Sequence, residues 1–265
     1  PTISITALSQ VNRAIDKGDG GATIAIKRSE IDGVAGNIVA AWPGFVETIF
    51  GIAIDIGSTT VAGHLIDLTT GEVMSSSGVM NPQIRFGEDL MSRVSYVMMN
   101  KGGEKELTTV IRNAIDELVH ELAEKASITS DKILEVVMVG NPIMHHILLG
   151  IDPTPLGAAP FVLATSEATY GAAEELDIHL PNASFYVGPC IAGHVGADTA
   201  AAILSEGPHR GSSMQLLIDV GTNAEIVLGD TTRQFAASSP TGPAFEGAQL
   251  SCGQRATARA IEKVR

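Results

Sequence analysis

Two segments of the chain share one pattern, in which an apolar run breaks at an aspartate and a glycine, passes through small polar residues and becomes apolar again. Residues 51 to 67 read GIAIDIGSTTVAGHLID, and residues 215 to 230 read QLLIDVGTNAEIVLGD. Each segment predicts a β-hairpin at the start of a three-stranded meander. Because the pattern occurs twice, it predicts a duplicated α/β architecture with two lobes that face a cleft.

The turns of these hairpins are suited to binding phosphate. Glycine lets a phosphate approach the backbone N–H groups, and small polar side chains add further donors. One such turn alone is explained by ordinary turn chemistry, but two at matching places favour a nucleotide site. The first turn contributes Gly57, Ser58, Thr59 and Thr60, and the second contributes Gly221, Thr222 and Asn223.

An aspartate precedes each glycine. Asp55 and Asp219 would repel a phosphate, so we expect them to bind the Mg²⁺ that accompanies a nucleotide, mainly through water, from opposite sides of the cleft. Asp198 is a candidate for a second Mg²⁺ carboxylate or for orienting the attacking water, with helix capping as the alternative. These three aspartates are the predicted catalytic residues.

A third glycine-rich segment follows the second meander. Residues 238 to 253 read SSPTGPAFEGAQLSCG, in which Gly242, Pro243 and Gly247 disfavour regular structure. We expect this segment to lie against the adenosine of a nucleotide, with Glu246 available to a ribose hydroxyl.

The charge and hydropathy of the chain exclude several classes of partner. The 265 residues include 17 Lys and Arg against 30 Asp and Glu, which gives a net charge of -13 and argues against nucleic acid and anionic membranes as partners. No apolar run approaches the roughly 20 residues that span a bilayer, and a signal peptide is not evident. We therefore expect a soluble, cytoplasmic protein.

Periodicity predicts the remaining elements. Apolar residues at helical spacing predict a long helix near residues 106 to 127, and residues 133 to 140 predict a buried strand. Asn141 and Pro142 predict the start of a second helix, and Gly207 the end of a third. Residues 151 to 183 are rich in loop signals. We expect residues 1 to 49 to be a linker or the tail of a preceding domain, 50 to 207 to be a first lobe, and 208 to 265 to begin a second.

Residues 50 to 265 resemble a known superfamily and a family within it. The paired turns and the late glycine-rich segment resemble the actin, Hsp70 and sugar kinase ATPases, whose lobes have a ribonuclease H-like fold. Longer strings are similar to the ATP-dependent reductive activators of corrinoid proteins. They include NPQIRFGEDLMSRVSYV, VGNPIMHHILLGIDPTPLGAAPF and PCIAGHVGADTAAAIL.

The resemblance implies a function and its cofactors. It implies ATP and Mg²⁺ as ligands, a corrinoid methyl-carrier protein as partner, and return of Co(II) to Co(I) with an electron from a donor protein or domain. It implies that the residues named above bind the nucleotide, and it leaves a homodimer open. We expect the family's N-terminal [2Fe–2S] domain to lie outside this chain, and the second lobe to be incomplete at residue 265. The two cysteines, Cys190 and Cys252, are expected to be buried thiols.

Other readings stay open from the sequence. A small-molecule kinase of the same superfamily is one alternative, and a filament-forming or chaperone-like nucleotide switch is another. The adjacent His145 and His146 are expected to pack or cap rather than bind metal, and His194 to line the cleft. The charged residues Arg85, Glu88, Asp89 and Arg93 are expected to form a solvated surface or a docking surface, and the methionines Met91, Met98 and Met99 are expected to belong to the core.

Overall fold

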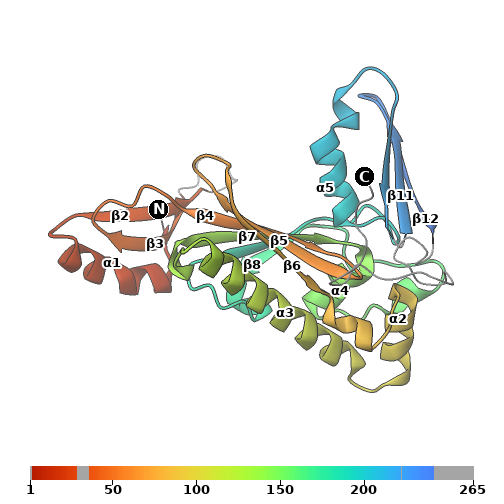
Figure 1. Cartoon of the computed structure of the whole chain (residues 1–265), viewed down its shortest axis with the longest axis horizontal. Coiled ribbons are helices and arrows are strands. Elements are labelled where there is room, and N and C mark those ends of the chain that lie inside the picture. The colour runs from red at the N-terminus through yellow and green to blue at the C-terminus, as the bar shows by residue number, and fades with distance from the viewer. Residues whose placement is uncertain (1, 29–35, 222, 242–265) are drawn as a thin grey trace, which may run out of the picture.

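The computed structural model describes residues 2–28, 36–221 and 223–241, which form a mixed α/β structure around a six-stranded sheet (Figure 1). The sheet has the order β6-β5-β4-β7-β9-β8, in which β7 runs parallel to β4 and β9 and the other neighbours are antiparallel. Its strands are β4 (Phe50–Ile56), β5 (Thr60–Asp67), β6 (Val73–Met80), β7 (Ile133–Gly140), β8 (Thr169–Ala172) and β9 (Ser184–Val187).

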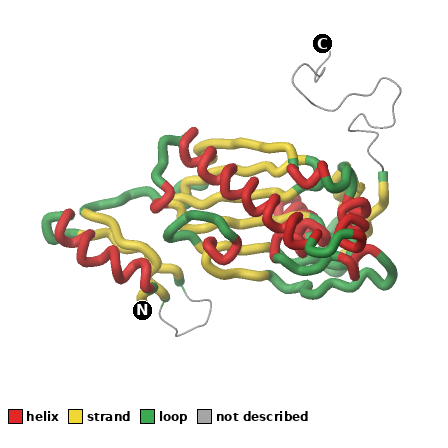
Figure 2. Tube along the Cα trace, turned by 90° about the horizontal axis from the view of Figure 1, so that it is seen from below, coloured by secondary structure: helices red, strands yellow, loops and turns green. Residues whose placement is uncertain are grey.

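Helix α3 (Gly103–Lys125) covers one face of the sheet along its length (Figures 1 and 2). Its apolar residues recur every three to four positions, so they form one stripe that is removed from water against β5 and β6. At Gly63 the helix lies so close to β5 that a β-carbon would come within 2.9 Å of a Leu122 methyl group. The stripe consists of Leu107, Ile111, Ile115, Leu118 and Leu122.

Three shorter helices have capping residues at their ends. Helix α2 (Leu90–Met99) is capped by Asp89 and α4 (Pro142–Leu149) by Asn141, and both side chains accept a bond from the first turn. Helix α5 (Ala197–Glu206) ends at Gly207 in the left-handed conformation that glycine favours. The predicted hairpin of β4 and β5, the long helix α3, the strand β7, the start of α4 and the end of α5 are thus confirmed to within a few residues. Short 3₁₀ turns occur at Pro82–Arg85 (η1), Ser130–Lys132, Thr154–Gly157, Ala173–Leu176 and Pro208–Arg210.

Residues 151 to 183 hold more structure than the sequence predicts. They include β8, which pairs with β9 at the edge of the sheet. The strand has only four residues, Thr169–Ala172, and half of them are exposed, so it lacks the apolar alternation that marks a longer strand.

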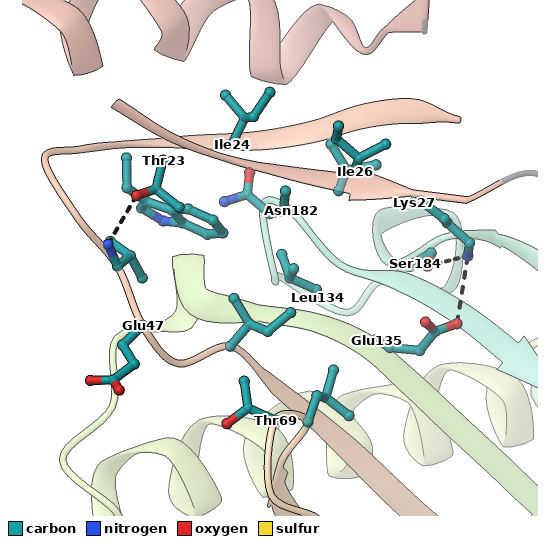
Figure 3. Close-up of a pocket in the computed structure, with 16 residues that line it drawn as sticks. Thr23, Ile24, Ile26, Lys27, Glu47, Thr69, Leu134, Glu135, Asn182 and Ser184 are labelled. Carbon is teal, nitrogen blue, oxygen red and sulfur yellow. Dashed lines mark hydrogen bonds and ion pairs between the residues drawn. The ribbon is translucent and has the colours of Figure 1, made fainter. Parts of the chain in front are cut away.

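The N-terminal segment forms a small unit of its own. Strands β1 (Thr2–Ile3), β2 (Ala22–Lys27) and β3 (Asn37–Pro43) make a sheet of order β1-β3-β2, on which α1 (Ile5–Lys17) packs. Between this unit and the six-stranded sheet lies a mostly apolar cavity of about 390 Å³ (Figure 3). Lys27 bridges the two units at the rim, with its ammonium group 2.7 Å from the Ser184 hydroxyl and 3.5 Å from the Glu135 carboxylate.

Trp42, the single tryptophan of the chain, lines the cavity between the two units, so its fluorescence is a probe of this junction. Its indole N–H donates to the Asp131 carboxylate at 2.8 Å, and the residue is 6% exposed. Replacing Asp131 by Ala leaves the indole N–H without this acceptor and is expected to cost about 1–2 kcal/mol. We expect a red shift of the tryptophan fluorescence and a lower denaturation midpoint. Asp16→Ala, at an exposed position on α1, is the control; equal spectra for both variants would contradict the prediction.

A second sheet contains β10 (Gln215–Val220), β11 (Asn223–Gly229) and β12 (Gln234–Pro240), joined in sequence order as an antiparallel meander. Helix α5 packs against both β7 and β10, and stands beside this sheet in Figure 1. One face of β10 is exposed: Leu216, Ile218 and Val220 are 60%, 51% and 56% accessible. The matching residues of β4, Ile52, Ile54 and Ile56, are at most 2% accessible.

The methionines of α2 are not in the core, contrary to the prediction. Met91, Met98 and Met99 are all exposed, because the buried face of this amphipathic helix carries Arg93, Val94 and Val97 instead. No helix in the described part of the chain is long and apolar enough to cross a membrane.

Candidate functional site

The candidate site lies where the parallel strands β4 and β7 end. Ile56 and Gly140 are paired neighbours at these ends, so the turn after β4 and the start of α4 after β7 lie side by side. The carboxyl ends of parallel strands are the usual place for ligands in open α/β sheets, since loops and helix N-termini converge there. Asp55 is the last but one residue of β4, and Gly57, Ser58 and Thr59 form the turn before Thr60 begins β5.

Three glycines let the backbones meet closely at this edge. A β-carbon on Gly57 would lie 2.5 Å from the Thr60 carbonyl oxygen, and one on Gly140 would lie 2.9 Å from that of Ile56. A β-carbon on Gly196, just before α5, would lie 2.5 Å from the Gly140 carbonyl oxygen. Any side chain at these positions would push the turn, β7 and α5 apart, which explains the residue type.

Four carboxylates gather around this junction. Asp55 on β4 is electrostatically coupled to Asp198, at the second position of α5, and to Asp219 on β10. Glu225, which lies opposite Asp219 in the β10–β11 register, is coupled to Asp198 and Asp219 as well. Sequence reasoning missed Glu225, although a single charged residue in the apolar strand NAEIVLG was a signal that could have found it.

The environment disfavours negative charge at three of these groups, Asp55, Asp198 and Glu225. Crowding by protein atoms raises the pKa of Asp55 from its ordinary value of 3.8 to about 6, and the charges of Asp198 and Asp219 add to the rise. Asp55 keeps an accessible surface, so solvent moderates this effect. Burial also raises the pKa values of Asp198 and Glu225, although the Thr199 N–H and the Ser238 hydroxyl donate to them and oppose the rise.

These residues fit a hydrated divalent cation better than a directly bound one. A cation would relieve the repulsion among the carboxylates. Within residues 2–28, 36–221 and 223–241, no three His, Cys, Asp or Glu side chains are grouped to hold a metal ion directly. Mg²⁺ keeps several of its waters in nucleotide sites and needs only one or two carboxylates. Asp55, Asp198 and Asp219 would hold it in that way, and their role stays a prediction.

The second turn is shorter than the first. Four residues separate the last paired residues of β4 and β5, whereas three separate Val220 from Ala224. The Gly221 N–H donates to the Asn223 carbonyl at 2.8 Å, and the Thr241 hydroxyl donates to the Gly221 carbonyl at 2.6 Å. The predicted site residues Thr222, Gly242, Pro243, Glu246 and Gly247 lie outside the described residues, as does Cys252.

Arg93 is inside the protein, which corrects the prediction that it forms part of a solvated or docking surface. Its side chain is fully buried and reaches under the first turn, whereas Arg85, Glu88 and Asp89 of the same segment are exposed. Arginine on an otherwise apolar helix face gives no sequence signal for such burial. Asn81, which follows β6 and also contacts the first turn, was missed too.

The histidines have structural contacts. His146 is buried, with Nδ1 2.8 Å from the Pro142 carbonyl oxygen and Nε2 accepting from the Ala164 N–H at 3.0 Å. His145 is also buried, and burial together with His146 lowers its pKa to about 4, so it is neutral at pH 7. The His194 ring contacts the Phe161 ring in a tilted arrangement, with ring centroids 4.2 Å apart and an interplanar angle of 59°. The buried packing predicted for the first two is confirmed, and so is the buried thiol of Cys190.

Comparison with known families decides the membership of the chain. Residues 50–211 match the model of the RACo middle region, and residues 213–265 match that of the C-terminal domain of RACo, the ASKHA domain. The chain belongs to the RACo family. This membership confirms the predicted actin-like ATPase fold class.

Three relatives of this RACo-family chain are informative. It is 39% identical over 218 residues to the corrinoid activation enzyme RamQ of Eubacterium limosum, covering 82% of this chain and 36% of the relative. It is 27% identical over 223 residues to the [Co(II) methylated amine-specific corrinoid protein] reductase of Methanosarcina barkeri, and the match covers 80% of this chain and 40% of that relative. The solved structure of a reductive activator for corrinoid, iron-sulfur protein superposes with a TM-score of 0.83 and 31% identity. The match covers 96% of this chain and 40% of that structure's chain. The chain therefore spans about two fifths of the length of these relatives.

Proposed function

We propose that this chain is the nucleotide-binding core of an ATP-dependent activator that returns a Co(II) corrinoid protein to Co(I). The observation that carries the proposal is the convergence of Asp55, Asp198 and Asp219 beside the first turn. Position 57 of that turn has no room for a side chain. This arrangement suits a phosphate chain and its Mg²⁺. The relatives are corrinoid activation and reductase proteins, which supports the corrinoid partner.

The proposed reaction needs an electron from elsewhere. Co(II) becomes Co(I) by gaining one electron, and ATP with water becomes ADP and phosphate. The two cysteines of this chain are too few for a cluster held by four thiolates, so a low-potential donor domain or protein supplies the electron. Nucleotide-driven closure would bias the docked corrinoid protein toward the reduced form, because a ligand shifts an equilibrium by its differential affinity for the two states.

Calorimetry of the chain with Mg²⁺-ADP and a non-hydrolysable ATP analogue tests the nucleotide site. We expect saturable binding that Asp219→Ala abolishes, and ATP hydrolysis that increases when a Co(II) corrinoid protein is added. Absence of binding to the unsubstituted chain would overturn the proposal. Phosphorylation of a small-molecule acceptor, or ATP-dependent light scattering from filaments, would identify a kinase or an assembly switch instead.

A further inference from the structure

Three successive carbonyl groups of the first turn accept hydrogen bonds from Asn81 and Arg93. The Asn81 side-chain amide donates to the Gly57 carbonyl at 2.8 Å, and the Asn81 backbone N–H donates to the Thr59 carbonyl at 2.8 Å. Between them, an Arg93 Nη2–H donates to the Ser58 carbonyl. The inner side of the turn is therefore a row of anchored carbonyl oxygens.

Anchoring these carbonyls fixes the direction of the N–H groups. In a trans peptide the C=O and the following N–H point in opposite directions, and the cis bond that the described residues contain is elsewhere, at Ala159–Pro160. The N–H groups of Ser58, Thr59 and Thr60 are thus directed away from Asn81 and Arg93, toward the accessible side of the turn. Successive N–H groups that share a direction form an anion-binding surface.

Arg93 is an unusual group to find in this position. It is 0% exposed, and its other contacts are the Gly87 carbonyl at 3.1 Å, the Gln83 side-chain oxygen at 3.3 Å and the Met144 sulfur at 3.2 Å. Among the described residues, no carboxylate forms an ion pair with it, although the charge of the nearby Asp89 favours its protonated form. Burial lowers its pKa to about 10, so Arg93 still carries its charge at pH 7.

A buried cation without a carboxylate partner is costly to retain for stability alone. Here it is hydrogen-bonded to the peptide group whose N–H belongs to Thr59, and a donor that bonds to a carbonyl polarises the N–H on the other side of the same peptide. We propose that Arg93 is a positioning residue for nucleotide phosphates, which orients the first turn and supports the negative charge bound on its outer side. This inference rests on the proposed nucleotide site.

The test compares Mg²⁺-ADP with adenosine, because adenosine lacks the phosphates that Arg93 would support. Arg93→Met is expected to weaken Mg²⁺-ADP binding at least about tenfold and to change adenosine binding less than about twofold. Arg93→Lys retains the charge without the planar fork that reaches Ser58, Gly87 and Gln83 together, so an intermediate loss of ADP affinity is expected. If Arg93→Met does not fold, the Lys variant decides.

Arg112→Met is the matched control. Arg112 also anchors a backbone carbonyl, that of Leu148 at 2.9 Å, but at the opposite end of α4 from Asn141. This variant is expected to lose stability while keeping the ratio of ADP to adenosine affinity. A folded Arg93 variant with unchanged ADP affinity, or with equal losses for ADP and adenosine, would overturn the inference. An unsubstituted chain that binds no Mg²⁺-ADP would overturn the proposed function itself.

Discussion

Replacing Asp55 by Asn is expected to weaken Mg²⁺-dependent nucleotide binding strongly and, without Mg²⁺, to make the chain more stable at neutral pH. The pKa of Asp55 is raised to about 6 in the folded chain, from 3.8. The folded state therefore binds more protons between these values, and stability falls as pH rises from about 4 to 6. Asparagine carries no charge to repel Asp198 and Asp219, so the gain should be present at pH 7 and absent below pH 4.

Urea unfolding at pH 7 and pH 4 measures the stability of the Asp55→Asn variant, and calorimetry measures its affinity for Mg²⁺-ADP. We expect a higher midpoint for Asp55→Asn at pH 7 only, and a loss of Mg²⁺-ADP affinity on the order of 100-fold, equal to about 2.8 kcal/mol. Asp16→Asn, at an exposed position on α1, should change neither quantity. A variant that is less stable than the unsubstituted chain at pH 7 would show that Asp55 supports the fold.

Replacing Gly196 by Ala is expected to disrupt the junction that holds Asp198. The new methyl group would lie 2.5 Å from the Gly140 carbonyl oxygen and 2.6 Å from the Asn141 Cα, both backbone atoms of the β7–α4 junction. Neither can rotate away, so α5 must move from β7. The overpacking should cost about 1–3 kcal/mol of stability. Mg²⁺-ADP affinity should fall as well, since Asp198 moves with the helix.

Gly78→Ala is the control for Gly196→Ala. A β-carbon on Gly78 would meet the Val61 carbonyl oxygen at 3.5 Å, an ordinary contact, so this variant should be close to neutral. Thermal unfolding and calorimetry of both variants decide the matter. Equal melting temperatures for the two would contradict the close approach at Gly196.

Helices and strands could be predicted from the sequence more accurately than the tertiary contacts between them. The meander of β4, β5 and β6, helix α3 and the caps at Asn141 and Gly207 follow from local periodicity and turn chemistry, which a single segment contains. The predicted surface position of Arg93 was wrong, because its burial depends on the Ser58 carbonyl group of a turn 35 residues away. The predicted core position of Met98 was wrong, because hydrophobicity alone does not say which face of α2 meets the core.

The candidate site shows the same division. Asp55, Asp198 and Asp219 were selected from their motifs, and the structure places them within electrostatic reach of one another. Glu225 and Asn81 join them through strand register and the path of the chain after β6, which no local motif encodes. The adenosine segment and the division of the chain into domains stay predictions.

Strand β10 has two faces with different properties, and this links the candidate site to the protein surface. Asp219 lies within electrostatic reach of Asp198 on α5, while Leu216, Ile218 and Val220, which alternate with it along the strand and lie on the other face, are exposed. Any surface that packs on this apolar face restricts the motion of the strand, and with it the carboxylate. By thermodynamic reciprocity, a ligand that fixes the carboxylate strengthens that packing equally. Through strand β10, nucleotide binding and binding at the outer apolar face would therefore be coupled.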